Sequence, residues 1–418
     1  MSSRHRMAAV DAQFYWMSAK LPNDQFLLYA FDDAPADCDR AIEQVCRRAR
    51  ACPELTMRVQ ERGPLVYPQW VPTAVGPRSV VRHDLPVPGW DDCLAAVAGL
   101  ADAQLDPRRM PWRLHVFTPI LGIPGVRGTG AVVVLQVAHA LADGARASAM
   151  AAWLLGRPGP LPRPPWPSAG FLPRRALDAA RAHRRLVRDI RAGQLAPGLG
   201  TRLPQCTNAR PAGVRAVRTL TRHRAQLRGP TVTVRVLVAV STALSRMLGH
   251  ADDSLGAEVP MAKTSVPQAN NHFGNVVVGL YPQLGLAARA ERIAADLANG
   301  RRRLEHPAAR AADRAFAAVP APLLRWGVAK FDPDARAARV AGNTVVSSVN
   351  RGAADLSFGE ARVVLTTGYP ALSPMMGLTH GVHGIGDVVA ISVHAAESVF
   401  HNGCEDIDEY AQLLDAAL

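Results

Sequence analysis

Apolar residues recur along this chain at two alternating kinds of spacing, one typical of strands and one typical of helices. Gln25–Phe31 is an apolar and aromatic run that predicts a strand, and residues 39–51 then carry apolar side chains at helical spacing on one face. Asp37 precedes that face and is the expected N-cap of the helix. Further strands are predicted at 79–83, 112–120 and 131–138, and a further helix at 90–102.

The second half of the chain again alternates between strand and helix patterns, after a stretch of different composition. Residues 157–168 (RPGPLPRPPWPS) are proline-rich and cannot form a regular helix or a central strand, and a basic helical stretch follows at 174–191. The expected division is a first lobe at 1–156, a linker with a basic helix at 157–211, and a second lobe at 212–418. In the second lobe, strands are expected at 215–220, 257–261, 275–281, 340–349, 361–366 and 387–394, and helices at 231–248, 286–304, 308–330 and 406–418. This mixture of elements predicts an α/β or α+β fold.

Size and charge narrow the class of protein without fixing its chemistry. The 418 residues correspond to two or three domains of roughly 150 residues each, and a hydrophobic content of 48% allows a sizeable core. The net charge of +13 suits an anionic partner, namely nucleic acid, an anionic membrane surface or a phosphate-bearing cofactor. A compositional drift toward arginine explains the charge equally well. Aromatic residues make up only 6% and no nucleic-acid-binding motif occurs, so nucleic acid is disfavoured.

Cysteine usage and hydropathy indicate the compartment. No CxxC and no histidine at zinc-ligand spacing occurs, so neither a disulfide framework nor a metal site is expected. The first residues lack the apolar run of a signal peptide, and no stretch approaches the ~20 apolar residues of a membrane span. We expect a reducing, cytoplasmic setting, and the basic helix at 174–191 leaves peripheral contact with anionic lipid open beside packing across the lobes. The six scattered cysteines are Cys38, Cys46, Cys52, Cys93, Cys206 and Cys404.

The most specific feature is the sequence HALADG at 139–144, directly after the apolar run at 131–138. A histidine at a strand end that faces a cleft can take a proton from a hydroxyl near neutral pH. Asp143 can pair with a cation or cap the next helix and so fix the loop that aims His139. Gly144 permits a tight turn or a close approach before that helix. A bare HxxxDG pattern is equally compatible with a locally bonded histidine beside an ordinary N-cap.

In context, the motif resembles the active-site motif of the thioester-dependent acyltransferase superfamily. That superfamily includes chloramphenicol acetyltransferase, carnitine acyltransferases, plant HxxxD acyltransferases and the condensation domains of peptide synthetases. The chain looks most like its bacterial wax ester synthase/diacylglycerol acyltransferase family. The similar segments occur in order along the whole chain: DAQF at 11–14, CPEL at 52–55, LDPRRMPW at 105–112, HALADG at 139–144, Gly274-Asn275, and VVSSVNRG at 345–352.

Three departures from the family pattern stand out. The family usually has two adjacent histidines, and here the first is Ala138. Its Asn-Asp at the start of the long second-lobe helix is Thr233-Val234, and its asparagine near a strand end is Ser348. These departures favour a divergent relative with a specialised acceptor.

The resemblance implies two chloramphenicol-acetyltransferase-like lobes, with mixed sheets flanked by helices and an active-site tunnel between them. His139 would deprotonate the acceptor, which would attack the thioester directly, with Asp143 orienting the loop. No bound cofactor is implied, since acyl-CoA or acyl-phosphopantetheine is the substrate. The implied substrate-binding residues are Gly274 and Asn275 at the lobe interface, Ser347, Ser348 and Asn350 as candidate oxyanion donors, and His272 as a tunnel residue.

The remaining histidines and motifs offer weaker chemistry. His380 and His383 form an HxxH in a glycine-rich stretch, where a solvated or locally bonded loop pair is favoured over a metal site. His115 alternates along a strand and is expected to be structural. No GxSxG elbow and no phosphate-binding glycine loop occurs.

Three functions remain open at this point. The first is an acyl-CoA-dependent O-acyltransferase. The second takes its acyl group from a carrier protein and forms an ester or amide, as in natural-product or complex-lipid pathways. The third is an inactive homologue that binds lipid or a protein partner.

Overall fold

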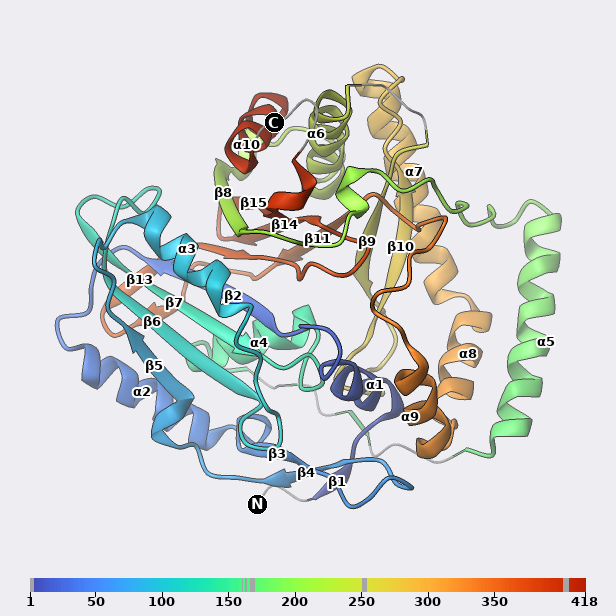
Figure 1. Cartoon of the computed structure of the whole chain (residues 1–418), viewed down its shortest axis with the longest axis horizontal. Coiled ribbons are helices and arrows are strands. Elements are labelled where there is room, and N and C mark those ends of the chain that lie inside the picture. The colour runs from blue at the N-terminus through green and yellow to red at the C-terminus, as the bar shows by residue number, and fades with distance from the viewer. Residues whose placement is uncertain (1–3, 160, 162–163, 166–169, 250–253, 401–405) are drawn as a thin grey trace.

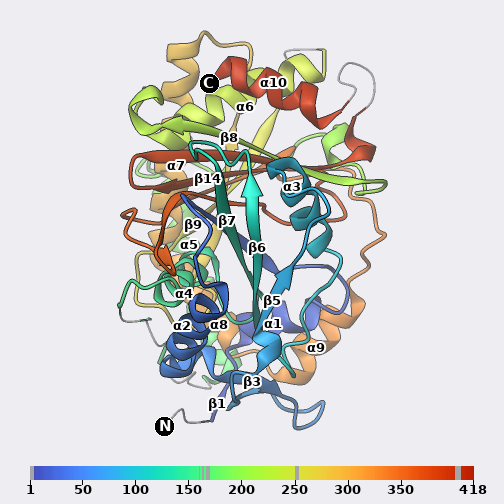
Figure 2. The ribbon, with the colours of Figure 1, turned by 90° about the vertical axis from the view of Figure 1, so that its left-hand side faces the viewer.

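The computed structural model of the chain describes residues 4–159, 161, 164–165, 170–249, 254–400 and 406–418 (Figure 1). Two six-stranded mixed sheets form two lobes, and a three-stranded sheet lies below the first lobe. Figure 2 shows the lobes one above the other, with the first lobe below. The expected two-lobed α/β architecture with mixed sheets is confirmed.

The first lobe is built around β7, which lies between β2 and β6 and is buried except at its first residue. Its sheet has the order β12-β13-β2-β7-β6-β5, and only β5 and β6 pair in parallel. Helices α1, α2 and α4 cover one face, and α3 covers the other. The strands are β2 (Gln25–Phe31), β5 (Val80–His83), β6 (Trp112–Leu121), β7 (Thr129–Val137), β12 (Ser357–Phe358) and β13 (Ala361–Gly368). The helices are α1 (Ala9–Met17), α2 (Cys38–Ala51), α3 (Trp90–Leu100) and α4 (Gly144–Leu154), and the small sheet holds β1 (His5–Arg6), β3 (Met57–Gln60) and β4 (Gln69–Pro72).

The second lobe packs α6, α7 and α10 on a sheet of order β10-β9-β11-β14-β15-β8. β11 pairs in parallel with both β9 and β14. The strands are β8 (Arg215–His223), β9 (Gly256–Ala262), β10 (Phe273–Gly279), β11 (Thr344–Asn350), β14 (Leu378–Ile385) and β15 (Val388–Ala396). The remaining helices of the chain are α5 (Leu172–Arg191), α6 (Val232–Met247), α7 (Leu286–Glu305), α8 (Pro307–Ala317), α9 (Ala321–Lys330) and α10 (Ile407–Ala417).

Segments from the second half of the chain cross the division between the lobes, and among them α9 buries Ala321, Leu324 and Val328 in the first-lobe core. β12 and β13 come from the second half of the chain, yet β13 pairs with β2 and completes the first-lobe sheet. β13 also passes close to β14 of the second lobe, because Gly381 has no side chain there. A Cβ on Gly381 would lie 2.4 Å from the carbonyl oxygen of Gly368. Residues 357–368 therefore tie the two lobes together, which the division at residue 212 does not capture.

Two expectations about secondary structure are wrong. The helix expected at 308–330 is two helices, because Pro320 serves as the N-cap of α9. The glycine-rich stretch with His380 and His383 is not a loop but the buried strand β14. Residues three apart on a strand point to opposite faces, and His380 bonds to Tyr410 of α10 at 2.9 Å.

Some sequence features fall outside the described residues, namely Cys404 and residues 160, 162–163 and 166–169 of the proline-rich stretch. The five other cysteines are free thiols. Within the described residues, His, Cys, Asp and Glu form no group of three that could hold a metal ion. In the same part of the chain, every helix is too short or too polar to cross a bilayer.

Candidate active site

His139 lies in the loop between the end of β7 and the start of α4. Its imidazole stacks on the ring of Phe14 from α1, with centroids 3.9 Å apart and planes at 3°. Phe273, at the start of β10 in the second lobe, lies 5.9 Å from the imidazole. Aromatic rings from both lobes therefore hold the histidine in place.

Asn271 fixes the tautomer of the neutral imidazole. Its Nδ2 donates to the carbonyl oxygen of His139 at 2.8 Å and to Oδ1 of Asp11 at 2.9 Å. The amide oxygen is thus left to accept, and it lies 2.8 Å from Nδ1 of His139. Nδ1 therefore carries the ring proton and Nε2 carries the lone pair.

Burial lowers the pKa of His139, an effect only partly offset by hydrogen bonds to its own backbone and to Asn271 and by the charge of Asp143. The neutral imidazole is the form that can accept a proton. Within the described residues, Nε2 makes no hydrogen bond and is the nitrogen left for a substrate.

Asp11 anchors the second-lobe loop to α1. Its carboxylate accepts from the backbone N–H groups of Asn270 and Asn271, each at 3.0 Å, in addition to the Asn271 amide. Burial raises the pKa of Asp11 to about 7, although these three donors favour the ionised form. Asp11 and Phe14 lie three residues apart and so share one face of α1. Asp11 and Phe14, the first and last residues of DAQF, thus act together: Asp11 holds the loop of Asn271, and Phe14 packs on the ring of His139.

Asp143 joins the same loop to α4. Its Oδ1 accepts from the N–H of Arg146 at 2.9 Å, as expected for an N-cap, and its Oδ2 accepts from the N–H of His272 at 2.8 Å. Asp143 therefore orients both sides of the lobe junction around His139. Gly144 has no left-handed backbone, and a Cβ there would lie an ordinary 3.8 Å from Val349. The tight turn or close approach expected at Gly144 is therefore absent.

The structure places three predicted second-lobe residues away from His139. The ring of His272 points to Ser265, with Nε2 2.8 Å from that residue's carbonyl oxygen, so only the backbone of His272 serves the site. Gly274 packs on α7, where a Cβ would lie 2.5 Å from Leu304. Asn275 is exposed, and its amide lies 3.3 Å from Glu258.

The candidate oxyanion donors on β11 separate into two faces. Ser348 exchanges a 2.8 Å hydrogen bond with Thr233, at the start of α6. Ser347 and Val349 share the opposite face of the strand, and Val349 is the residue nearest to Gly144. Of the two serines, Ser347 thus lies on the face of β11 that is turned toward the loop of His139. Asn350 accepts from the N–H of Gly352 at 3.0 Å and shapes the strand end.

The Thr233–Ser348 bond brings together two of the three departures from the family pattern. The two hydroxyls satisfy each other by a side-chain hydrogen bond. The changes are therefore mutually compatible within the second lobe.

A cavity of about 210 Å³ opens at the lobe junction between α3, the start of β2, and β8. Apolar side chains line it, among them Phe26, Val97 and Leu372, and Asp24 lies beside them. Asp24 accepts a hydrogen bond from the side chain of Gln136 at 2.7 Å, and Gln136 lies three residues before His139 along the chain. Burial raises the pKa of Asp24 to about 6. Three basic residues also border the cavity: Lys20, Arg210 and Arg215.

Sequence reasoning missed the residues that hold His139 and its loop in place. Asn270 and Asn271 precede the GN pair and were not singled out, because asparagine in a loop is ordinarily a turn residue. Asp11 and Phe14 were noticed only as part of a family-like opening segment. Their spacing of three residues on a helix was the available signal that they act on one face.

Comparisons with known proteins agree with this geometry. Residues 7–260 match the family model described as wax ester synthase/diacylglycerol acyltransferase catalytic domain. A search of curated protein sequences finds no match.

Three solved structures share the fold over nearly the whole chain. The wax ester synthase/diacylglycerol acyltransferase of Marinobacter aquaeolei VT8 is 18% identical, with a TM-score of 0.61 over 99% of this chain and 98% of that one. A mutant starter condensation domain of rhizomide synthetase RzmA, in complex with C8-CoA and Leu-SNAC, is 14% identical, with a TM-score of 0.60 over 100% and 94%. The trichothecene 15-O-acetyltransferase TRI3 of Fusarium sporotrichioides is 12% identical, with a TM-score of 0.59 over 99% and 94%.

Proposed function

The chain belongs to the wax ester synthase/diacylglycerol acyltransferase family, and on that premise we propose that it transfers an acyl group from acyl-CoA to a hydroxyl acceptor with His139 as general base. The observation that carries the proposal is the hydrogen bond between Nδ1 of His139 and Asn271. It leaves the Nε2 lone pair as the basic atom of a neutral imidazole.

The reaction proceeds in two proton-coupled steps. Nε2 of His139 takes the hydroxyl proton while the acceptor oxygen attacks the thioester carbonyl, which forms a tetrahedral intermediate. That intermediate collapses with cleavage of the carbon–sulfur bond, and the imidazolium returns its proton to the leaving thiolate. The products are an ester and free CoA, and the acyl group never bonds to the protein. General acid–base help of this kind contributes about 10²–10⁴-fold.

Positioning and charge stabilisation supply the rest of the acceleration. We assign the oxyanion contact to Ser347, because it lies on the face of β11 that Val349 turns toward the active loop. The Asn271 bond gains strength when His139 becomes a cation, since a hydrogen bond to a charged donor is the stronger one. Asp143, which favours the charged form of His139 through its own charge, assists in the same step.

We place the donor chain in the cavity at the lobe junction on the ground of its chemistry, although His139 itself is not among the residues that line it. Its apolar lining suits an acyl or pantetheine chain, and its border of Lys20, Arg210 and Arg215 suits the CoA phosphates. Arg210 and Arg215 are held in place by ion pairs with Asp334 and Asp102.

A carrier-protein-bound donor is the second candidate. The similar starter condensation domain of rhizomide synthetase was solved in complex with C8-CoA and Leu-SNAC. The same base and the same basic border would serve an acyl-phosphopantetheine and an amine.

Purified protein incubated with acyl-CoAs of graded chain length and a panel of alcohols tests the proposal. Release of free thiol together with an ester of the expected mass is the predicted result. Product only with acyl-carrier protein or only with amines would favour the second candidate. Donor binding without thiol release under every combination would contradict both and favour an inactive lipid-binding homologue.

A further inference from the structure

Helix α9 is apolar on both of its faces, although one face lies at the protein surface. The inner residues Ala321, Leu324 and Val328 are buried. On the outer face, Leu323 is 50% exposed and Trp326 is 61% exposed. A surface helix ordinarily keeps polar residues toward water, so two large apolar side chains on its outer face are unusual. The outer face of α9 is therefore one that an apolar medium would cover.

A second exposed apolar pair lies at the same end of the molecule. Leu65 and Val66, in the loop that leads to β4, are 74% and 48% exposed. The next residue, Tyr67, donates its hydroxyl to the carbonyl oxygen of Val319 at 2.7 Å, directly before α9. In Figure 1 the loop and α9 both lie at the lower right. We call Leu65, Val66, Leu323 and Trp326 the α9 patch.

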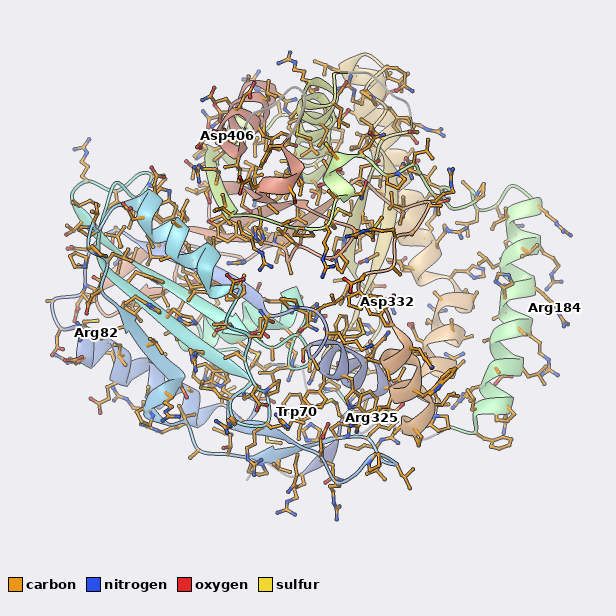
Figure 3. The ribbon with its side chains drawn as sticks, in the orientation of Figure 1. Trp70, Arg82, Arg184, Arg325, Asp332 and Asp406 are labelled. Atoms are coloured by element: carbon orange, nitrogen blue, oxygen red, sulfur yellow. The ribbon has the colours of Figure 1, made fainter. Side chains whose placement is uncertain are left out.

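Positive charge is concentrated beside this patch. Helices α5, α8 and α9 together carry eleven Arg or Lys and three Asp, an excess of eight within a net charge of +13 for the whole chain. α5 lies along α8 and is joined to its N-cap by the hydrogen bond between Asp189 and His306 at 3.0 Å. No residue of α5 is buried, so its arginines reach solvent, and Arg184 projects away from the protein in Figure 3.

From these two observations we infer that the α9 patch docks on an anionic lipid bilayer. Leu323 and Trp326 enter the boundary between headgroups and acyl chains, where an aromatic ring with one polar edge is favoured. The basic side chains of α5, α8 and α9 lie over the lipid phosphates. This inference does not depend on the proposed acyl transfer.

Other occupants fit the surface less well. A second copy of the chain would bring like charges together. A nucleic acid would match the charge but would leave two leucines, a valine and a tryptophan facing a polar backbone. Lipid satisfies the apolar and the basic residues at once.

Co-sedimentation of the whole protein with vesicles tests the inference. One set of vesicles contains only phosphatidylcholine, and the other also contains phosphatidylglycerol. The test variant is L323S/W326S, and the matched control is V87S/V214S, which changes valines that are 60% and 71% exposed elsewhere. Trp326→Phe keeps an aromatic ring but not its polar edge, and should bind with an affinity between those of the parent and L323S/W326S. Far-ultraviolet circular dichroism confirms that each variant is folded.

We expect the parent, the V87S/V214S control and Trp326→Phe to bind the anionic vesicles, more weakly at high salt. L323S/W326S should bind at least about 10-fold more weakly, because two apolar side chains no longer leave water. Equal binding by L323S/W326S and the control would overturn the inference. So would failure of the parent to bind anionic vesicles, or a concentration-dependent dimer that L323S/W326S abolishes.

Discussion

The side-chain amide of Asn271 bonds to both the carbonyl oxygen and the Nδ1 atom of His139, each at 2.8 Å, across the junction between the two halves of the chain. The same amide is held by Asp11, so the loop at 270–271, α1 and the histidine form one connected unit. The position of the His139 imidazole therefore depends on the two lobes being docked.

Asn271→Ala should lower kcat by about 10-fold or more while changing KM little, because the imidazole loses its orientation but the cavity is untouched. The Asn271 bond raises the pKa of His139. Its loss should therefore move the acid limb of the pH–rate profile to lower pH. The profile is measured for kcat/KM across pH 4–8.

Asn208→Ala is the matched control for this variant. Asn208 is also a buried amide, and it donates to the carbonyls of Gly342 and Met375 far from His139. It should lose stability of about 1–3 kcal/mol and keep the parent acid limb. An acid limb of the pH–rate profile that is unchanged in Asn271→Ala would contradict the assigned tautomer of His139.

Asp143→Ala should lower both stability and activity. It removes the N-cap of α4 and leaves the N–H of His272 without its acceptor, at a cost of about 1–3 kcal/mol in the free energy of unfolding. Asp143→Asn keeps one of the two accepting oxygens and should fall between the parent and the alanine variant. Chemical denaturation and turnover measure the two effects.

Asp37→Ala provides the comparison for a lost N-cap elsewhere, since Asp37 accepts from the N–H of Arg40 at 2.9 Å. It should lose about 1 kcal/mol of stability and keep its kcat. If Asp143→Ala kept full stability yet lost all turnover, Asp143 would instead have a direct catalytic role.

Ser347→Ala should reduce kcat by about 10²–10³-fold if its hydroxyl donates to the oxyanion. Ser348→Ala should have a much smaller effect, because that hydroxyl bonds to Thr233 on the other face of β11. Steady-state kinetics with one competent donor–acceptor pair compares the two. Equal losses in both variants would exclude this division of roles.

The protein should become less stable as the pH falls from 6.5 toward 4. Burial lowers the pKa of His115 and His394 to about 4 and of His380 to about 3, and it lowers that of His383 well below its usual value. For a group whose pKa is depressed by folding, stability is fully present above the unfolded pKa and is lost below it. These four histidines are therefore neutral in the folded protein and gain protons only on unfolding.

Two buried carboxyls oppose this trend. The pKa of Asp11 is raised to about 7 and that of Asp24 to about 6, so their stabilising contribution is lost as the pH rises from about 4. The histidines whose pKa is lowered by burial, which also include His139 and His83, outnumber the carboxyls with a raised pKa, so unfolding near pH 5 should take up a positive net number of protons. Urea unfolding at a series of pH values gives that number from the slope, and a stability that rises on acidification would contradict it.

Much of the fold is predictable from the sequence because local patterns persist in the structure. The run at 131–138 became β7, and Asp37 caps α2 as expected. β14 escaped prediction because its glycines, typical of loops, are needed where Gly381 approaches Gly368 of the crossing strand. That close approach is a tertiary contact between the lobes, and no local pattern in the sequence predicts it.

The candidate site divides in the same way. His139 and Asp143 lie in one contiguous motif, and both lie at the junction. Asn271 is 132 residues from His139 along the chain, and no periodicity connects them. His272 was noticed for its side chain, whereas its backbone N–H makes the contact with Asp143.

The most direct measurement is the turnover of His139→Ala beside His272→Ala and His383→Ala, with thioester affinity determined for each. We predict that His139→Ala loses acyl transfer by about 10²-fold or more while thioester binding stays close to that of the parent. His272→Ala should lose far less, because its ring bonds to Ser265 away from the site. His383→Ala should also lose far less, because the buried ring of His383 packs against Gly368 and Gly381. A His139→Ala variant that turns over like the parent would contradict the assignment of His139 as the base.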